Sequence, residues 1–277
     1  MTNEKIPLVA VLGSPISHSK SPVLHSYWLR KYGINGHYIP MEVDTVDLDN
    51  VLISMPKMGF IGANITIPHK ENVMKIADKI SDRAAMIGAA NTLSFGSNGR
   101  IYADNTDGYG FIENIRQHQP EWHATDGPSL ILGAGGASRA VVSSLLEKSA
   151  PEIWITNRTR ARAEKIASDF GARVKVIDWF SVNKFLPDAA TVINATSLGM
   201  VGKPELTIDL KPLSNKTLVT DLVYNPIETH LLTQARERGC RTVDGVGMLI
   251  HQAVPGFSRW FNVQPTVDTA LRDLLLS

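Results

Sequence analysis

The sequence predicts an α/β protein with two domains. Short apolar runs alternate with helix-like stretches along nearly the whole chain, a pattern typical of βα units and parallel sheets. A length of 277 residues is enough for one or two domains of about 150 residues each. The stretch Gln119–Pro128 contains two prolines, one glycine and few apolar residues, which is typical of a loop near a domain boundary. We expect domains at 1–108 and 109–245 with a cleft between them, and C-terminal helices at 246–277 that return to the first, smaller domain.

The elements expected in the first domain follow from apolar runs and from the helical spacing of apolar residues. Strands are predicted at Leu8–Leu12, Tyr38–Met41 and Ile61–Ile67, and helices at Pro22–Tyr32, Val46–Met55, Lys70–Lys79 and Gly108–Gln117. A small hairpin is predicted over Leu93–Tyr102, because Gly96, Asn98 and Gly99 favour a turn inside it.

The second domain alternates more regularly and is predicted to be doubly wound. Its six strands are expected at Leu130–Leu132, Ile153–Thr156, Val174–Ile177, Val192–Ala195, Leu218–Val223 and Thr242–Asp244. The clearest helices between them are Ser138–Lys148, Arg160–Asp169 and Glu228–Arg238. Two further helices, Met248–Trp260 and Val267–Leu276, follow the last strand. They are surplus to a six-stranded domain, so we expect them to pack towards the first one.

Composition excludes several classes of protein. Apolar residues make up 43% and charged residues 20%, as in ordinary globular proteins, and the net charge of +1 argues against a nucleic-acid partner. The longest clean apolar runs, such as Leu8–Leu12, are too short to span a bilayer, so no membrane partner is expected. Cys240 is the single cysteine and cannot form a disulfide within the chain, which fits the cytoplasm. No metal is expected, because one cysteine and eight scattered histidines show no paired ligand spacing.

A glycine-rich turn follows the first strand of the second domain, in Ser129-Leu-Ile-Leu-Gly-Ala-Gly-Gly-Ala-Ser138. Gly133 permits a tight turn, and Gly135 permits close approach of the backbone to a pyrophosphate at the start of a helix. Ser138 occupies the third fingerprint position, where glycine or alanine is usual, so the match is incomplete. An ordinary strand-to-helix turn is the alternative, but the βαβ setting of 129–157 favours a dinucleotide.

The end of the next strand predicts which dinucleotide is bound. An NAD site usually carries an acidic residue there, whereas this chain has Arg158, Arg160 and Arg162 and no acid. An arginine binds a 2′-phosphate through charge-assisted hydrogen bonds, so NADP is favoured over NAD. The alternative is a solvent-exposed run of basic residues at the start of a helix. That arrangement is unfavourable, because the positive end of the helix dipole repels cations.

Polar residues cluster at three strand ends or helix starts of the first domain. Pro68 suits a first helical position, which predicts that Lys70 lies in a first helical turn, where the charged lysine is disfavoured and suited to acid–base work. Asp107 begins another helix, and serines follow the first strand. The alternative for Asp107 and the serines is helix capping. Together with a nicotinamide cofactor, this set suits a polyhydroxylated small molecule as substrate.

The sequence resembles the shikimate dehydrogenase family over nearly its whole length. The motifs that carry the resemblance occur in the same order and at family spacing: Ser17-His-Ser-Lys-Ser-Pro22, Gly62-Ala-Asn-Ile-Thr66, Pro68 and Lys70, Gly88 with Asn91-Thr92, Asn105-Thr-Asp-Gly108, Gly133-Ala-Gly-Gly-Ala137, Asn157-Arg-Thr159, Asn194-Ala-Thr-Ser197, Asp221-Leu-Val-Tyr224, and Asp244-Gly-Val-Gly-Met248 with Gln252. The resemblance implies NADPH-dependent, reversible reduction of 3-dehydroshikimate to shikimate, a step towards aromatic amino acids.

The resemblance also implies roles for individual residues. Lys70 and Asp107 are the expected catalytic pair, and Ser19, Ser21 and Tyr224 are expected to hold the substrate carboxylate. The ring hydroxyls are assigned to Asn64, Thr66, Asn91 and Gln252. The cofactor is assigned to Gly133, Ala134, Gly135, Gly136 and Ala137 at the pyrophosphate, Asn157, Arg158, Thr159 and Arg162 at the 2′-phosphate, Leu222, Gly245 and Met248 at the nicotinamide, and Asp82 nearby.

Some positions depart from the family pattern. His69, Ser26 and Ala90 stand where the family often has an aromatic residue, asparagine and valine, and none of them removes an expected contact.

The alternative functions are a quinate/shikimate dehydrogenase, a non-catalytic NADPH-binding regulator on the same scaffold, and a folate-linked dehydrogenase with a similar domain plan. The arginine run opposes an NAD-dependent quinate enzyme, and the presence of Lys70 and Asp107 opposes a regulator. A monomer or a homodimer is expected.

Overall fold

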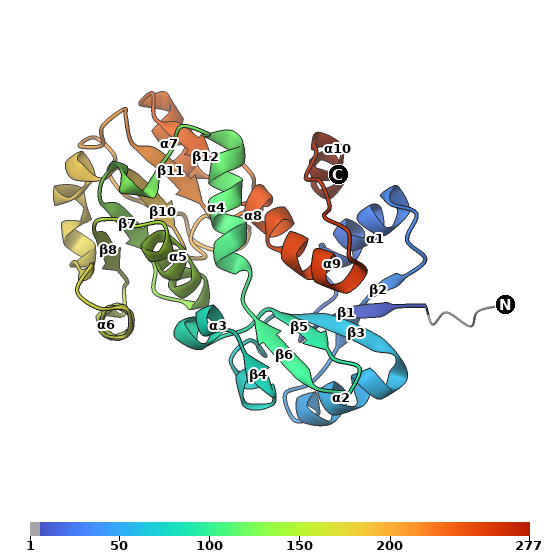
Figure 1. Ribbon diagram of the computed structural model, residues 1–277. Coiled ribbons are helices and arrows are strands. Elements are labelled where there is room, and N and C mark those ends of the chain that lie inside the picture. The colour runs from blue at the N-terminus through green and yellow to red at the C-terminus, as the bar shows by residue number, and fades with distance from the viewer. Residues whose placement is uncertain (1–5) are drawn as a thin grey trace. The chain divides into compact units, whose positions relative to one another are not determined.

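The computed structural model describes residues 6–277 and divides into two compact units (Figure 1). Unit 1 extends to Thr106 and includes Ile250–Ser277, and unit 2 comprises Asp107–Leu249. Each unit has its own six-stranded sheet and its own helices. The predicted α/β class with two domains is therefore confirmed.

Unit 1 is built on a mixed sheet with the strand order β2-β1-β3-β5-β6-β4. Its strands are β1 (Leu8–Gly13), β2 (His37–Glu42), β3 (Phe60–Ile65), β4 (Lys79–Ile80), β5 (Thr92–Phe95) and β6 (Ile101–Asp104). Strand β1 pairs in parallel with β2 and β3, while β5 is antiparallel to β3 and β6, as the predicted hairpin requires. The carboxyl ends of β1, β2 and β3 therefore share one edge, from which the loops with the predicted substrate residues emerge.

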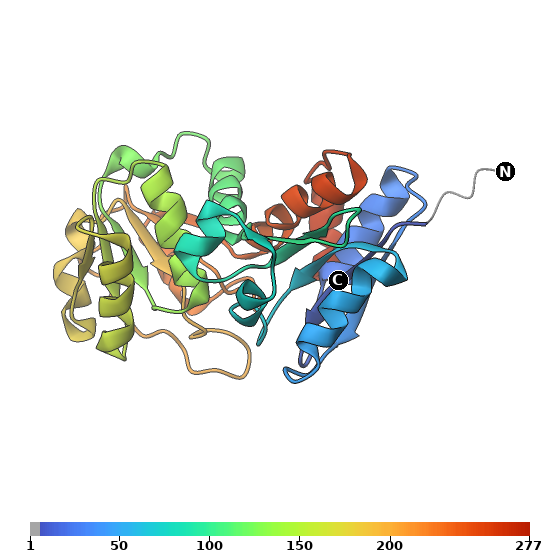
Figure 2. The ribbon, with the colours of Figure 1, turned by 60° about the horizontal axis from the view of Figure 1, so that its bottom comes forward.

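Helices from both ends of the chain cover unit 1. They are α1 (Ser21–Lys31), α2 (Leu48–Ser54), α3 (Asp82–Ile87), α9 (Ala253–Phe261) and α10 (Thr269–Leu276), with 3₁₀ turns η1 (Met55–Met58) and η2 (Asn72–Lys75). In Figure 2 the red C-terminal helices lie beside the blue α1, and α9 also packs on β3 and β5. The Trp260 indole on α9 donates a 2.9 Å hydrogen bond to the Leu93 carbonyl on β5, which fixes this helix against the sheet.

Unit 2 contains a fully parallel sheet with the order β12-β11-β10-β7-β8-β9. Its strands are β7 (Ser129–Leu132), β8 (Ile153–Thr156), β9 (Val174–Val176), β10 (Thr191–Asn194), β11 (Leu218–Asp221) and β12 (Arg241–Val243). Counted from β7, this is the 3-2-1-4-5-6 order of the Rossmann fold. The strand order reverses between β7 and β10, so a ligand is expected at their carboxyl ends.

Each face of the unit 2 sheet has its own apolar core. One core joins the sheet to α4 (Asp107–His118), α5 (Gly136–Glu147) and α6 (Arg160–Phe170). The other joins it to α7 (His230–Glu237) and to the 3₁₀ turns η4 (Trp179–Lys184) and η5 (Leu186–Asp188). The turn η3 (Ala124–Asp126) precedes β7. Strands buried on both faces explain why the sequence shows short continuous apolar runs here.

Two helix predictions are wrong. The segment Lys70–Lys79 forms only the short turn η2, and Lys70 lies in a turn before it, because the Asp78 amide pairs with the Ile101 carbonyl and draws the chain into β4. The expectation that Lys70 lies in a first helical turn is therefore wrong as well. The helix predicted at Met248–Trp260 is two helices, α8 (Val246–His251) and α9, separated at Gln252. Pro255 has no N–H to donate to the His251 carbonyl, which accounts for the interruption.

His25 is a fully buried, neutral side chain in the core of unit 1. Its ring stacks on Tyr38 with 4.0 Å between the ring centroids, and neither ring nitrogen has a hydrogen-bond partner among the described residues. Burial lowers the pKa of His25 from 6.5 to about 3. Between these two values the unfolded chain binds a proton that the folded chain does not.

We therefore predict that the free energy of unfolding falls as the pH drops below 6.5, with a contribution from His25 of about 1.4 kcal/mol per pH unit until its folded pKa is reached. The measurement is urea unfolding at several values between pH 6.5 and 5. His25→Phe removes the titrating group and should reduce this slope, whereas His37→Gln at an exposed position should leave it unchanged. Equal slopes for wild type and His25→Phe would contradict the assignment.

Candidate active site

A cavity of about 470 Å³ lies at the carboxyl edge of the unit 2 sheet. It is bordered by the turns that follow β7, β8 and β10, which is where the strand order predicts a ligand. The residues that line it are Gly133, Ala134, Gly135, Asn157, Arg158, Arg162, Trp179, Ala195, Thr196, Ser197, Leu198, Glu205, Leu206 and Thr207. Six of them were predicted as cofactor ligands from the sequence.

The glycine turn has the shape that a phosphate group needs. Gly133 has φ +110°, and a Cβ there would lie 2.9 Å from the Ala195 carbonyl oxygen, so only glycine fits. A Cβ at Gly135 or Gly136 would meet no atom within 4 Å and would project into open space. Ser138 explains the incomplete fingerprint, because its buried hydroxyl accepts a 3.2 Å hydrogen bond from the Gly135 amide. Ala137 follows in the exposed first turn of α5.

The arginines at the start of α6 are not equivalent. Arg160 forms an ion pair with Glu164 at 2.8 Å, one helical turn further on. Arg158 and Arg162 line the cavity and have no acidic partner within residues 6–277. Thr159 is not among the lining residues, but its carbonyl accepts a 2.9 Å hydrogen bond from the Asn157 side-chain Nδ2. The cavity therefore has two unneutralised guanidinium groups, as an anionic ligand would require.

One wall of this cavity is organised by Asn194, a fully buried side chain at the end of β10. Its Oδ1 accepts hydrogen bonds from the Thr196 amide at 3.0 Å and the Thr196 hydroxyl at 2.7 Å. The Thr196 hydroxyl in turn accepts from the Leu198 amide at 3.0 Å. Sequence reasoning assigned no role to this wall, although its place after β10 at the strand-order reversal was a usable signal. Trp179 begins the 3₁₀ turn η4 and Glu205 lies in an irregular segment, and neither position offered such a signal.

The residues assigned to the nicotinamide lie near the ends of β11 and β12. Asp221 is buried, which raises its pKa, and its Oδ1 accepts from the Val223 amide and from Asn194, both at 2.9 Å. These bonds hold the turn that carries Leu222 and the exposed Tyr224. A Cβ on Gly245 would lie 2.5 Å from the Leu222 carbonyl oxygen, so these two backbones pack closely. Met248 on α8 packs against the same apolar core as Leu222.

Unit 1 brings three predicted substrate ligands into one hydrogen-bond network. Asn91 donates to the Gln252 side chain at 3.2 Å, and Asn64 donates to the Asn91 carbonyl at 3.0 Å. The Asn64 Oδ1 accepts a 2.7 Å hydrogen bond from the Tyr38 hydroxyl. Thr106 also donates to the Gln252 carbonyl at 2.7 Å. The sequence assigned no role to Tyr38 or Thr106, because only the folded sheet brings them next to the asparagines.

The serines and Lys70 lie on two adjacent loops of unit 1. The Ser14 amide donates to the Ile67 carbonyl at 3.1 Å, which joins the loop after β1 to the loop after β3. Ser19 accepts a 3.3 Å hydrogen bond from the Ser21 amide just before α1, but the N-cap of this helix is Lys20 and no side chain caps it. Thr66 and Lys70 are both half-buried on the second loop. The Lys70 carbonyl accepts from the Ala90 amide at 2.8 Å, which fixes the backbone at the lysine.

The acidic candidates have different surroundings. Asp82 is the exposed first residue of α3 and does not line the unit 2 cavity. Asp107 is a buried residue in the first turn of α4. The buried Asp104, which sequence reasoning missed, bonds Arg83 at 2.6 Å and Arg259 at 2.9 Å. These arginines hold the pKa of Asp104 well below its usual range against the opposing effect of burial.

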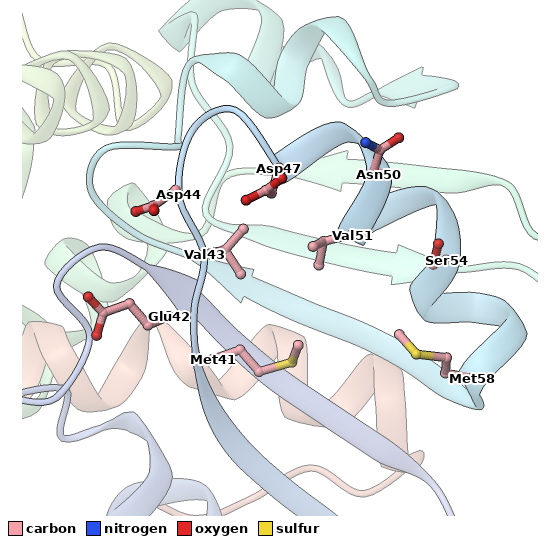
Figure 3. Close-up of a pocket in the computed structure, with 9 residues that line it drawn as sticks. All are labelled: Met41, Glu42, Val43, Asp44, Asp47, Asn50, Val51, Ser54 and Met58. Carbon is pink, nitrogen blue, oxygen red and sulfur yellow. The ribbon is translucent and has the colours of Figure 1, made fainter.

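A second hollow of about 580 Å³ in unit 1 contains none of the predicted site residues. The carboxylates of Glu42, Asp44 and Asp47 lie towards one end of it and Met58 towards the other (Figure 3). Across residues 6–277, the His, Cys, Asp and Glu side chains form no group that could hold a metal ion.

None of the helices in the described part of the chain is long and apolar enough to cross a membrane.

Comparisons with known proteins agree with this arrangement. A family model described as "Shikimate dehydrogenase substrate binding domain" matches residues 11–93, and one described as "Shikimate / quinate 5-dehydrogenase" matches residues 117–231. The shikimate dehydrogenase (NADP(+)) of Cereibacter sphaeroides is 58% identical over 273 residues, 99% of this chain and 98% of the relative.

Solved structures of the same fold cover nearly the whole chain. Quinate dehydrogenase from Corynebacterium glutamicum, solved in complex with NAD, has a TM-score of 0.91 at 30% identity and covers 98% of this chain and 99% of its own. Shikimate 5-dehydrogenase from Thermus thermophilus, solved with NADP(H) and shikimate, has a TM-score of 0.87 at 31% identity and the same coverage. By full-length similarity and by both family models, the chain belongs to the shikimate dehydrogenase family.

Proposed function

We propose that this chain is an NADP-dependent shikimate dehydrogenase that reversibly reduces 3-dehydroshikimate to shikimate in aromatic amino-acid biosynthesis. The observation that carries the proposal is the pair Arg158 and Arg162, which line the unit 2 cavity without an acidic partner among the described residues. An anion is the ligand that would neutralise them, and NADP differs from NAD by such a group. Relatives at 55–58% identity over essentially the whole chain carry the same activity in their names.

The residues of the cavity fit a dinucleotide. The open space at Gly135 and Gly136 is where a side chain would exclude a pyrophosphate, and the amides of the first turn of α5 face an anion favourably. Asn157, Arg158, Thr159 and Arg162 are proposed to surround the 2′-phosphate. Leu222, Gly245 and Met248 are proposed to flank the nicotinamide, with Asp82 near the cofactor.

The substrate is proposed to be held by the polar residues of the loops and of the unit 1 network. Ser19, Ser21 and Tyr224 bind its carboxylate. The ring hydroxyls are bound by Asn64, Thr66, Asn91 and Gln252. Asn64 and Asn91 already make hydrogen bonds within the protein, which orient their side chains. The hydrogen bonds that they can still form with a substrate therefore point in defined directions, which favours one arrangement of ring hydroxyls.

Lys70 and Asp107 are proposed to carry the proton step. The bound cofactor supplies the hydride that reduces the C3 carbonyl of the substrate. Lys70 donates or polarises a proton at that oxygen, and Asp107 orients Lys70 and bonds the same group. The half-buried, backbone-fixed setting of the lysine supports a defined position for its side chain.

Two alternatives are less well supported. A quinate enzyme that uses NAD would leave Arg158 and Arg162 without a charge partner, and a non-catalytic regulator would have no need of Lys70 and Asp107. We further propose that the protein works in the cytoplasm, since its single cysteine, Cys240, is a buried free thiol. A monomer or homodimer is proposed, which light scattering of the purified protein would test.

Replacing Arg158 by alanine should weaken NADP binding roughly tenfold or more, because losing a charge-assisted pair costs about 1.5–3 kcal/mol. The weak use of NAD should stay nearly unchanged, since NAD lacks the 2′-phosphate. Arg160→Ala is the matched control, because Arg160 is paired with Glu164 and does not line the cavity. Dissociation constants for both cofactors from calorimetry provide the measurement. Equal losses with NADP and NAD would mean that Arg158 shapes the loop and does not read the phosphate.

Replacing Lys70 by alanine should reduce kcat by about 10²–10⁴-fold, the usual contribution of a positioned acid–base group. Shikimate binding should suffer less, because the asparagine network remains. Asp107→Asn should also lower kcat. If the two residues act as a unit, the fold-reduction of kcat in the double variant should be smaller than the product of the two single reductions. The measurement is kcat and KM with shikimate and NADP for the four proteins. Near-normal turnover in a folded Lys70→Ala variant would refute the mechanism.

A further inference from the structure

Trp179 differs from the other four tryptophans of the chain. Trp28, Trp122, Trp154 and Trp260 are all at most 9% exposed. The indole N–H groups of Trp28, Trp122 and Trp260 donate to protein oxygens, and Trp154 packs edge-on against Phe185. Trp179 is half-buried, and its indole has neither a ring contact nor a hydrogen bond within residues 6–277. Core packing therefore accounts for four tryptophans fully and for Trp179 only in part.

The backbone holds Trp179 in one place. It is the first residue of η4, and the preceding Asp178 caps this turn by accepting a 2.8 Å hydrogen bond from the Phe180 amide. Part of the indole packs against the apolar core beneath the sheet. The neighbouring Phe180 is 94% exposed and does not line the cavity. Two consecutive aromatic residues thus have different surroundings, and only the first borders the nucleotide cavity.

The same cavity contains an aromatic surface and two unneutralised guanidinium groups. Arg158 lies just before α6 and Arg162 lies in its first turn, and Trp179 comes from the segment after β9, the next strand of the sheet. A ligand that satisfies both features has an anionic group joined to a flat ring. Bases stack on aromatic side chains whatever their edge groups, because every base has a π face.

We propose that Trp179 is the stacking platform for the adenine base of the nucleotide. The inference rests on the proposed function, because it assumes that the 2′-phosphate of NADP lies at Arg158 and Arg162. Stacking also lets the indole exclude water from one face of the base, which strengthens the neighbouring charge-assisted hydrogen bonds.

The test uses 2′,5′-ADP, which carries the adenine and the 2′-phosphate but no nicotinamide. Trp179→Ala in the full-length protein should bind it about 5- to 150-fold more weakly than wild type, the range for loss of one base–aromatic stack. Phe180→Ala is the matched control and should bind as wild type does. Trp179→Phe keeps an aromatic face and should recover most of the affinity, which separates stacking from a general loss of structure.

Tryptophan fluorescence supplies an independent readout. Binding of 2′,5′-ADP should quench the emission of wild type, and Trp179→Phe should abolish this quenching while still binding the ligand in calorimetry. If wild type binds 2′,5′-ADP but Trp179→Ala and Phe180→Ala bind it equally well, the inference is overturned and the proposed function is not. If wild type itself binds neither 2′,5′-ADP nor NADP, the proposed function fails.

Discussion

The geometry of both units depends on buried asparagine side chains at the ends of strands. A buried amide must use its donors and its acceptor, because each polar group left unpaired costs about 1–3 kcal/mol. Asn64 meets this requirement with Tyr38 and with the Asn91 carbonyl, and Asn194 meets it with Asp221 and Thr196. Each asparagine therefore holds several turns in one arrangement. The buried amides thereby connect the turns at the strand ends to the sheet behind them.

The arginines of unit 2 that precede or begin α6 differ in whether an acidic side chain neutralises them. Three arginines at the start of one helix oppose its dipole, and Glu164 compensates only Arg160. Arg158 and Arg162 line a cavity that the glycine turn also borders. The fold alone does not decide between NAD and NADP, since the same sheet order serves both. The choice depends on a few side chains after β8, and a change at Arg158 should alter it without altering the fold.

Unit 1 shows how a segment without strong local preferences is fixed by its neighbours. Lys70 lies on the loop after β3, which is joined to the loop after β1, and its own carbonyl accepts a hydrogen bond from the Ala90 amide. Asp104, at the end of β6, is held by Arg83 from α3 and Arg259 from α9, so residues distant in the sequence meet at one carboxylate. This carboxylate lies two residues before Thr106, which joins Asn91 and Gln252. The segment that leads to Asp107 is thereby ordered from both sides.

The sequence by itself determined the α/β class, the six strands of unit 2, the hairpin of unit 1 and the two chemically informative turns, the glycine turn and the arginine run. These features are encoded by residues close together in the sequence. The signals are apolar runs, glycines that permit tight turns, and the absence of an acidic residue after β8. The tertiary structure alone decided that Lys70 lies in a turn and not a helix, because the pairing of β4 with β6 outweighs the weak helical pattern of the segment after Lys70. It also decided which arginines remain unpaired, which tryptophan borders the cavity, and which asparagines share hydrogen bonds. Those outcomes depend on contacts between residues far apart in the chain, which no local pattern of residues encodes.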